Sequence, residues 1–526
     1  MTRWQWCVPL ALVAVLAASG TSQAAIPDDA VVRTEAGAVR GTVTEDARVF
    51  QGIPYAAPPV GALRWREPKP APHWSGVRDA TRPGPPCPQG PGEIPGGSTN
   101  EDCLYLNVTT PSAGAAKPRP VVVWVHGGGF YMGAGSNYDA HRLAARGDVV
   151  VVTINYRLGI FGFFGHPGLP GSGTFGLSDQ QAALAWVRRN AAAFGGDPGN
   201  VTVAGQSAGA ISNCAHLTAP SSRGLFDKAV LQSGSCETSW LRNFDYRGQP
   251  ADAIYEPLPS LRDQGSRVAA ELGCTGADAV ACLRELPVGA LMPKLQKFIQ
   301  PAYGTAILPV NPADAVRAGR VHRVPVLSGS TRDETTQSTA LYDKGKPMGE
   351  ETYRAVLGDT FGDRLPQVEA EYPRQSFDSA ALAWSAITTD RKWACTQYGT
   401  SLHLARRVPV YQYEFADPDA PLLSPLPPGM PMGAQHASDL WSLFDLRGIP
   451  PKFTPEQQRL SDQMIAYWAN FAATGDPGNA EGPRWPRFDP ADRQPYVQSL
   501  APGAGGVRPV DLPAQDHCRF WAGFER

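Results

Sequence analysis

The serine at position 207 has the setting of a nucleophile. Gly205 and Gly209 flank it in a G-x-S-x-G pattern, an apolar β-type run at 201–204 precedes it, and residues with helical spacing follow it. A serine hydroxyl needs a base to remove its proton, so the side chain must stand clear of the sheet. Glycines two residues before and after the serine avoid a collision at a sharp strand-to-helix turn. The pattern predicts a nucleophile elbow, although one such match is weak evidence in a chain with 55 glycines.

A second segment could stabilise developing negative charge. The residues HGGGF at 126–130 follow an apolar run at 121–125 that is typical of a buried strand. Glycines after a strand leave backbone N–H groups free to point at an oxyanion. The alternative is a plain flexible loop, so this segment gains weight only if it lies beside Ser207.

The general base should be a histidine that follows both the serine and its acid, because hydrolases with a nucleophile elbow carry the triad in that order. Other histidines after Ser207 lie on a predicted helix, before the strand of the acid, or beside a cysteine: His216, His322, His403 and His517. His436 remains, in a loop between a predicted strand at 410–415 and a helix. We therefore predict that His436 is the base.

The acid should follow the end of a strand. Asp333 and Glu334 come shortly after a predicted strand at 324–329. Either carboxylate could hold the imidazole tautomer and stabilise its charged form. Position alone does not choose between them, and a solvated acidic turn is the alternative for such a pair.

The elements that position these residues alternate between strand and helix. Apolar strands are predicted at 121–125, 149–157, 201–204 and 229–233, with a helix at 178–193, so the centre of the sheet should be parallel. Further helices are predicted around 263–273, 351–357 and 456–473, and a small antiparallel hairpin within 31–53. The fold class is α/β, and no linker divides the chain, so we expect one domain over 25–526.

Composition and the N-terminal residues limit the expected partners and location of the protein. A net charge of −2 offers no basic field for nucleic acid. Residues 1–24 read as a secretory signal peptide, with Arg3, an apolar run at 7–18 and a small-x-small site at 22–24. No later run reaches about 18 apolar residues, so no membrane span is expected. The protein should be secreted, or periplasmic if the source has an outer membrane.

The cysteine count agrees with export. Nine cysteines are present, and removal of Cys7 leaves an even number: Cys87, Cys103, Cys214, Cys236, Cys274, Cys282, Cys395 and Cys518. There is no C-x-x-C pair, which disfavours zinc or redox sites. Disulfides are the better interpretation, although the count alone allows many pairings.

At this point the chain resembles the type-B carboxylesterases, the family of carboxylesterases and cholinesterases with the α/β-hydrolase fold. The resemblance covers nearly all of 31–526. The nucleophile motif F-G-G-x4-V-x-V-x-G-x-S-A-G is matched at 194–209, and the second motif, EDCLYLNV, at 101–108. Both matches are specific.

The resemblance implies roles for individual residues. It places the acid at Glu334, the base at His436, and the oxyanion donors at Gly128, Gly129 and Ala208. It also implies Trp240 in the acyl pocket, the ion pairs Arg64–Glu101 and Arg157–Asp179, and three disulfides, Cys87–Cys103, Cys274–Cys282 and Cys395–Cys518. Cys214–Cys236 is then left by subtraction.

The chain also departs from the family. Thr335 and Ala437 stand where glycine is common, so the local loop shape could differ. Gln206 replaces the glutamate of cholinesterases, and the 88–102 loop has no aromatic residue. We therefore expect a secreted serine esterase for neutral esters with short to medium acyl chains, a small-molecule enzyme that needs no metal or organic cofactor. A cholinesterase-like or lipase-like esterase and a non-catalytic binding protein of the same fold are the alternatives, and the sequence does not indicate an oligomeric state.

Overall fold

The computed structural model describes residues 1–2, 30–114, 117–423, 429–478 and 482–524. The predicted signal peptide therefore lies almost wholly outside the described residues. No helix in the described ranges is both long and apolar enough to cross a membrane.

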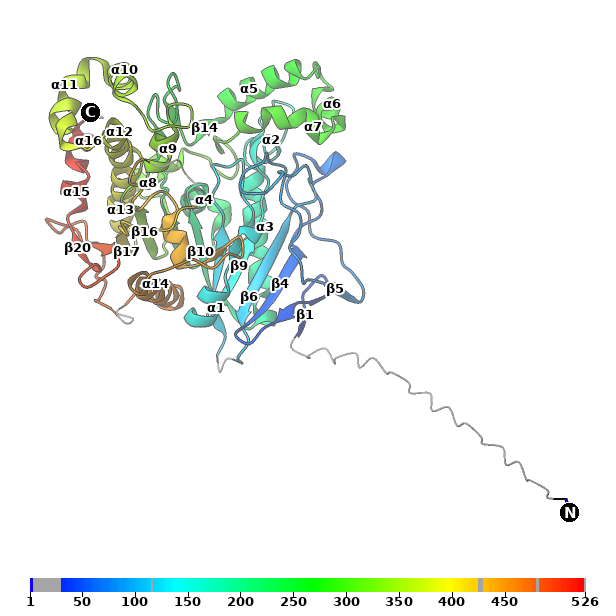
Figure 1. Cartoon of the computed structure of the whole chain (residues 1–526). Coiled ribbons are helices and arrows are strands. Elements are labelled where there is room, and N and C mark those ends of the chain that lie inside the picture. Colours follow the sequence, from blue (N-terminus) through cyan, green and yellow to red (C-terminus); the bar gives the residue numbers. More distant parts are fainter. Residues whose placement is uncertain (3–29, 115–116, 424–428, 479–481, 525–526) are drawn as a thin grey trace.

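An 11-stranded sheet forms the centre of the molecule (Figure 1). From β19 to β9 the neighbouring strands are parallel, and the strands at both edges are antiparallel. The prediction of a largely parallel sheet is confirmed. In spatial order the strands are β20 (Arg508–Val510), β19 (Val497–Leu500), β17 (Val410–Phe415), β16 (Val326–Thr331), β11 (Lys228–Gln232), β10 (Gly196–Gln206), β7 (Arg119–Val125), β9 (Val150–Ile154), β6 (Tyr105–Pro111), β4 (Ala47–Pro54) and β3 (Thr42–Val43).

Helices cover both faces of this sheet, which is why its central strands are apolar throughout. Val121, Val123 and Val125 of β7 join a core that includes residues of α3, α4 and α13, whereas Val122 and Trp124 join a second core with α1 and α14. The alternation follows from the period of two in a strand. These covering helices are α1 (His141–Gly147), α3 (Phe175–Asn190), α4 (Ala208–Thr218), α13 (Cys395–Ala405) and α14 (Pro455–Thr474).

The boundaries of α14 illustrate how local sequence sets an element. Thr454 and Gln457 form a capping box at its start, and Gly475, with φ of 81°, ends it. The helix was predicted over 456–473, one residue shorter at each end.

Other predicted boundaries shift for polar reasons. The strand predicted at 149–157 ends at Ile154, because Asn155 and Arg157 are buried polar residues that bond to groups outside the sheet. Asn155 accepts a hydrogen bond from the Gly135 N–H (2.8 Å), and Arg157 pairs with Asp179 (2.7 Å). β16 lies two residues further along than predicted.

Figure 1 shows two further helical groups at one end of the molecule, α5–α7 and α10–α12. The second group packs around a third core that includes Trp384 and Trp521. The first group consists of α5 (Leu258–Glu271), α6 (Ala279–Glu285) and α7 (Val288–Leu291), and the second of α10 (Glu350–Phe361), α11 (Leu365–Glu371) and α12 (Ala380–Thr389). The remaining helices are α2 (Gly159–Phe163), α8 (Pro312–Arg317), α9 (Thr336–Leu341), α15 (Leu512–Gln515) and α16 (Cys518–Phe524).

The remaining strands are short. β1 and β2 form the predicted N-terminal antiparallel hairpin, which turns at Gly37, and β5 joins them. These strands are β1 (Val31–Arg33), β2 (Ala38–Arg40), β5 (Val77–Asp79), β8 (Tyr138–Asp139), β12 (Ser239–Trp240), β13 (Asp252–Ala253), β14 (Glu256–Pro257), β15 (Ala302–Tyr303) and β18 (Asp445–Leu446).

The structure contains the two ion pairs and three disulfides implied by the resemblance, and also the disulfide Cys214–Cys236 that was left by subtraction. The expected ion pairs form, with Arg64 Nε 2.7 Å from Glu101 Oε1 and Arg157 Nη2 2.7 Å from Asp179 Oδ1. In the described part of the chain four disulfides are present: Cys87–Cys103, Cys214–Cys236, Cys274–Cys282 and Cys395–Cys518.

Candidate active site

Ser207 stands at a strained turn between β10 and α4. Its φ of 56° and ψ of −123° lie in a region that non-glycine residues rarely adopt. Hydrogen bonds on both sides hold this conformation, from Ser207 N to Gln232 O and from Ile211 N to Ser207 O, each 2.9 Å. The serine side chain is therefore presented at the carboxyl end of the sheet.

The two glycines of the elbow are sterically required. A Cβ at Gly209 would lie 2.0 Å from the Val125 carbonyl oxygen, and one at Gly205 would lie 2.7 Å from the Gly209 carbonyl carbon. Neither atom can move without disturbing β7 or α4. The steric reason given from the sequence is thus confirmed.

The glycine segment after β7 lies beside the elbow. A Cβ at Gly127 would lie 2.9 Å from the Gln206 carbonyl oxygen. Gly128 and Gly129 have φ of 98° and 59°, and no described residue accepts a hydrogen bond from their N–H groups. Ala208 is the first residue of α4, so its N–H has no acceptor within the helix either. Three backbone donors are therefore free next to Ser207.

His126 anchors this segment. Its ring stacks on Tyr156 with centroids 4.4 Å apart, and its Nδ1 lies 2.8 Å from Gly127 O. Burial lowers the pKa of His126 to about 4, so the ring is neutral at pH 7 and donates from Nδ1. Its role is to hold the loop in place.

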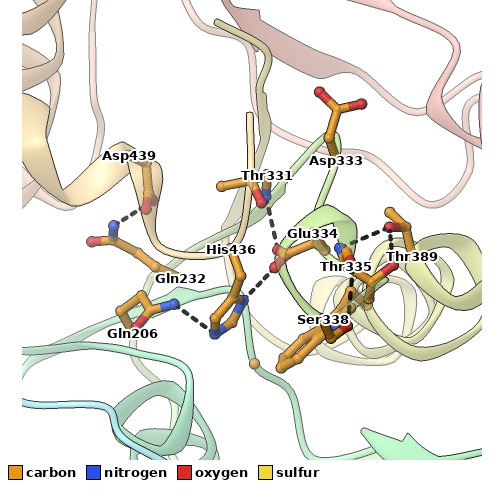
Figure 2. Close-up of polar contacts among 12 residues, drawn as sticks. Gln206, Gln232, Thr331, Asp333, Glu334, Thr335, Ser338, Thr389, His436 and Asp439 are labelled. Atoms are coloured by element: carbon orange, nitrogen blue, oxygen red, sulfur yellow. Dashed lines mark hydrogen bonds and ion pairs between the residues drawn. The ribbon is translucent and has the colours of Figure 1, made fainter. Parts of the chain in front are cut away.

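The acid and base positions meet across two loops (Figure 2). His436 Nδ1 hydrogen bonds to Glu334 Oε2, and Glu334 Oε1 accepts a hydrogen bond from Thr331 N (2.9 Å). The Glu334 side chain is fully buried, whereas 24% of the His436 side chain is exposed. The geometry thus orients the imidazole with a proton on Nδ1 and leaves Nε2 as the acceptor.

Asp333 has a different orientation. Its Oδ2 accepts hydrogen bonds from Ala434 N and Arg332 Nη2, both at 2.8 Å, and Figure 2 shows it pointing away from His436. Of the two carboxylates that position left open, Glu334 is the one that contacts the histidine.

Gln206 contacts the histidine, which the sequence did not predict. Its Nε2 is 3.0 Å from His436 Nε2, so the amide donates to the nitrogen that would serve as the base (Figure 2). Ser207 Oγ makes no hydrogen bond with a described residue. Catalytic hydrogen bonds are often long in enzymes without substrate. A contact between Ser207 Oγ and His436 Nε2 would require the Gln206 amide to move away from that nitrogen.

A π-helical segment between α12 and α13, η9 (Asp390–Ala394), packs against the histidine. The Trp393 ring lies against the His436 ring with centroids 4.6 Å apart and planes tilted by 35°. Such segments are frequent at functional sites because the extra residue redirects side chains. Neither Trp393 nor the π-helical turn was predicted, since no local residue pattern encodes it.

The two departures from the family pattern have local explanations. Thr335 is buried, and its hydroxyl donates to Ser385 O (2.8 Å) and contacts Thr389, which ties the acid loop to α12. Ala437 takes φ of 66°, so an alanine adopts the left-handed conformation that suits glycine.

A second buried carboxylate lies behind the histidine loop. Asp439 Oδ2 accepts hydrogen bonds from Gln232 Nε2 (2.8 Å) and Tyr413 OH (3.2 Å), and Trp468 Nε1 donates to Gln232 (3.0 Å). Burial raises the pKa of Asp439 to about 6. The sequence offered only the i+3 spacing from His436 as a signal for this residue.

Trp240 lies on β12 and is half-buried. The Lys392 Nζ lies 4.2 Å from its ring centroid. The histidines set aside on sequence grounds bond elsewhere: His216 to Gln180 and Ser222, His322 to Ala219 O, His403 to Glu237, and His517 to Glu371. No group of three or more His, Cys, Asp or Glu side chains in the described ranges could hold a metal ion.

Comparison with known proteins gives one consistent result. The carboxylesterase family profile matches residues 28–521. The para-nitrobenzyl esterase of Bacillus subtilis is 36% identical over 488 residues, which cover 89% of this chain and 94% of that enzyme. The human cocaine esterase is 34% identical over 496 residues, covering 87% and 84%. The rat pyrethroid hydrolase Ces2e is 34% identical over 521 residues, covering 90% and 86%.

The extent of these matches, together with the mostly parallel sheet and its flanking helices, decides the class of the protein. The chain belongs to the carboxylesterase family of α/β-hydrolases and is a carboxylic ester hydrolase.

Proposed function

We propose that this chain is a secreted serine esterase that hydrolyses neutral carboxylic esters through an acyl-enzyme intermediate, with Ser207, His436 and Glu334 as its triad. The observation that carries the proposal is the orientation of His436, which Glu334 holds through Nδ1 while Nε2 faces the elbow residues. The strained φ of Ser207 supports it, because strain of this kind is retained at functional sites.

In the first half of the reaction, Ser207 Oγ attacks the ester carbonyl as its proton passes to His436 Nε2. The carbonyl oxygen becomes an oxyanion, which the N–H groups of Gly128, Gly129 and Ala208 can stabilise by hydrogen bonds. The positive end of α4 adds to this stabilisation. When the intermediate collapses, the imidazolium gives its proton to the leaving alkoxide and the alcohol departs.

In the second half, water replaces the alcohol. His436 removes a proton from the water, the hydroxide attacks the acyl carbon, and the same donors stabilise the second oxyanion. Collapse releases the carboxylic acid and returns the proton to Ser207. Glu334 stays ionised and stabilises the imidazolium in both halves.

Substitution of the nucleophile tests the triad. Ser207→Ala should lower kcat for p-nitrophenyl butyrate at least about a thousandfold, since only the oxyanion donors and binding remain. Ser212→Ala, on the same helix, is the matched control and should keep wild-type activity. A Ser207→Ala enzyme with a tenth of wild-type kcat, or organophosphate labelling on another serine, would contradict the proposal.

Secretion and domain organisation belong to the same proposal. Four disulfides and the lack of a spanning helix in the described ranges are compatible with an exported protein. We infer that residues 1–24 are removed and that 25–526 fold as one domain around the 11-stranded sheet. Sequencing of the N-terminus of exported protein should begin near Ala25.

A further inference from the structure

Lys392 is a buried cation beside the proposed triad. Only 2% of the residue is exposed, and its Nζ lies over three aromatic rings, at 4.2 Å from Trp240, 3.9 Å from Phe244 and 4.4 Å from Trp393. Trp393 also contacts the His436 ring. One indole ring is therefore in contact with both the Lys392 ammonium and the imidazole.

The ammonium is incompletely satisfied. No residue in the described ranges accepts a hydrogen bond from Lys392 Nζ, although an ammonium has three donors. The faces of three rings attract a cation, but they do not replace hydrogen bonds to oxygen. Lys392 Nζ is not one of the fully enclosed nitrogen and oxygen atoms that lack a partner, so solvent still reaches it. A ligand oxygen that took the place of this solvent would supply the acceptor.

We propose that Lys392 determines the charge specificity of this esterase, its ammonium binding a carboxylate carried on the acyl chain of the substrate. The inference rests on the proposed function and extends its substrate class from neutral esters to half-esters of dicarboxylic acids. Trp240 and Phe244 lie on the segment after β11, whereas Lys392 and Trp393 lie on η9. Two separate segments thus build one subsite.

The charges around Lys392 favour an anion that arrives with the substrate. The carboxylates of Asp245 and Glu334 act on its charge from neighbouring segments, but neither accepts a hydrogen bond from it. Glu334 is already engaged by His436 and Thr331. His436 itself contacts the Trp393 ring, and Asp390 of the same π-helical turn accepts a hydrogen bond from Tyr372 OH.

The pH dependence follows from burial. Desolvation lowers the pKa of Lys392 to about 7, while Asp245 and Glu334 oppose the shift. The ammonium is therefore charged below about pH 7 and loses its proton above it. Any preference that depends on this charge should weaken as the pH rises through that value.

The test compares two esters of equal length, p-nitrophenyl hemiglutarate and p-nitrophenyl valerate. Wild type should prefer the anionic ester at pH 6, and Lys392→Met should lose about 10- to 100-fold of that preference, measured as the ratio of the two kcat/KM values. Lys117→Met, at the opposite end of β7 from the elbow, is the matched control and should match wild type. An equal effect on both esters would assign Lys392 to folding alone and overturn the proposal.

A second measurement needs no variant. The ratio of the two kcat/KM values in wild type cancels the titration of the triad, because both esters share it. This ratio should fall between pH 6 and pH 8.5, and a constant ratio would overturn the inference. Loss of both activities in Ser207→Ala tests the proposed function separately, so failure of either idea can be recognised.

Discussion

Glu334→Gln would reverse the hydrogen bond that orients the proposed base. Thr331 N donates to Glu334 Oε1 at 2.9 Å in a fully buried site, so the glutamine carbonyl oxygen must take that position. The NH2 group then faces His436 Nδ1. Both are donors in the working tautomer, so the imidazole must move its proton to Nε2. A ring protonated at Nε2 cannot accept the proton of Ser207.

The size of the effect follows from this tautomer change. A carboxylate-to-amide substitution that fixes the wrong tautomer lowers kcat about 10⁴-fold, which corresponds to about 5 kcal/mol in the activation free energy. The measurement is kcat for p-nitrophenyl butyrate at neutral pH, with the melting temperature recorded to show that the variant folds. The loss should be in kcat rather than in KM, since the bond orients the base and does not bind substrate.

Asp333→Asn supplies the matched control. The asparagine carbonyl oxygen can still accept from Ala434 N, whose distance to Asp333 Oδ2 is 2.8 Å, and the side chain points away from His436. We expect a loss of less than about tenfold, in line with a change outside the reacting groups. If Asp333→Asn were the more damaging substitution, the identification of the acid would be wrong.

Two further predictions concern pH. Gln206→Glu places a negative charge about 3 Å from His436 Nε2, and this charge stabilises the imidazolium. The acid limb of the pH profile of kcat/KM should therefore move up by about 1–3 pH units. If the acid limb did not move, the contact between residue 206 and His436 would not persist in solution. Burial raises the pKa of Asp390 to about 8, above its unfolded value of about 3.9. Its contribution to stability is therefore present at low pH and lost as the pH rises towards 8. In wild type this makes the free energy of unfolding fall with pH, and Asp390→Asn should reduce that slope by up to about 1.4 kcal/mol per pH unit. Urea titrations at pH 5–8 measure the slope. Parallel slopes for variant and wild type would contradict this.

Features that depend on local pattern could be predicted from the sequence. The strand, the elbow at Ser207 and the helix behind it follow from apolar runs and two glycines, because steric demands at a sharp turn act over a few residues. The order of triad residues along the chain reduced nine histidines to His436. The disulfide partners came from the family resemblance, since a cysteine count alone permits many pairings.

Features that depend on packing could not be predicted. Gln206 and Ser207 are adjacent in sequence, yet only the fold shows that the Gln206 amide reaches His436. Helical spacing continues through 380–405, so the π-helical turn that presents Lys392 and Trp393 leaves no trace in the pattern. The position of Asp333 and Glu334 in the sequence likewise did not show which of them is the acid. The backbone conformation of the loop decides this, because it directs Glu334 towards His436 and Asp333 away from it.

The positive charge of Lys392 changes the reason for expecting that quaternary ammonium esters are poor substrates. A quaternary ammonium needs aromatic faces together with nearby negative charge, and the 88–102 loop offers no ring. The structure does bring three rings together, and one of them, Trp393, contacts His436, but the Lys392 ammonium already lies over all three faces. Gln206 is neutral as well, although the carboxylates of Asp245 and Glu334 act on the charge of Lys392. We therefore expect choline esters to be disfavoured because the protonated Lys392 already places a cation over these rings, and not because aromatic faces are lacking.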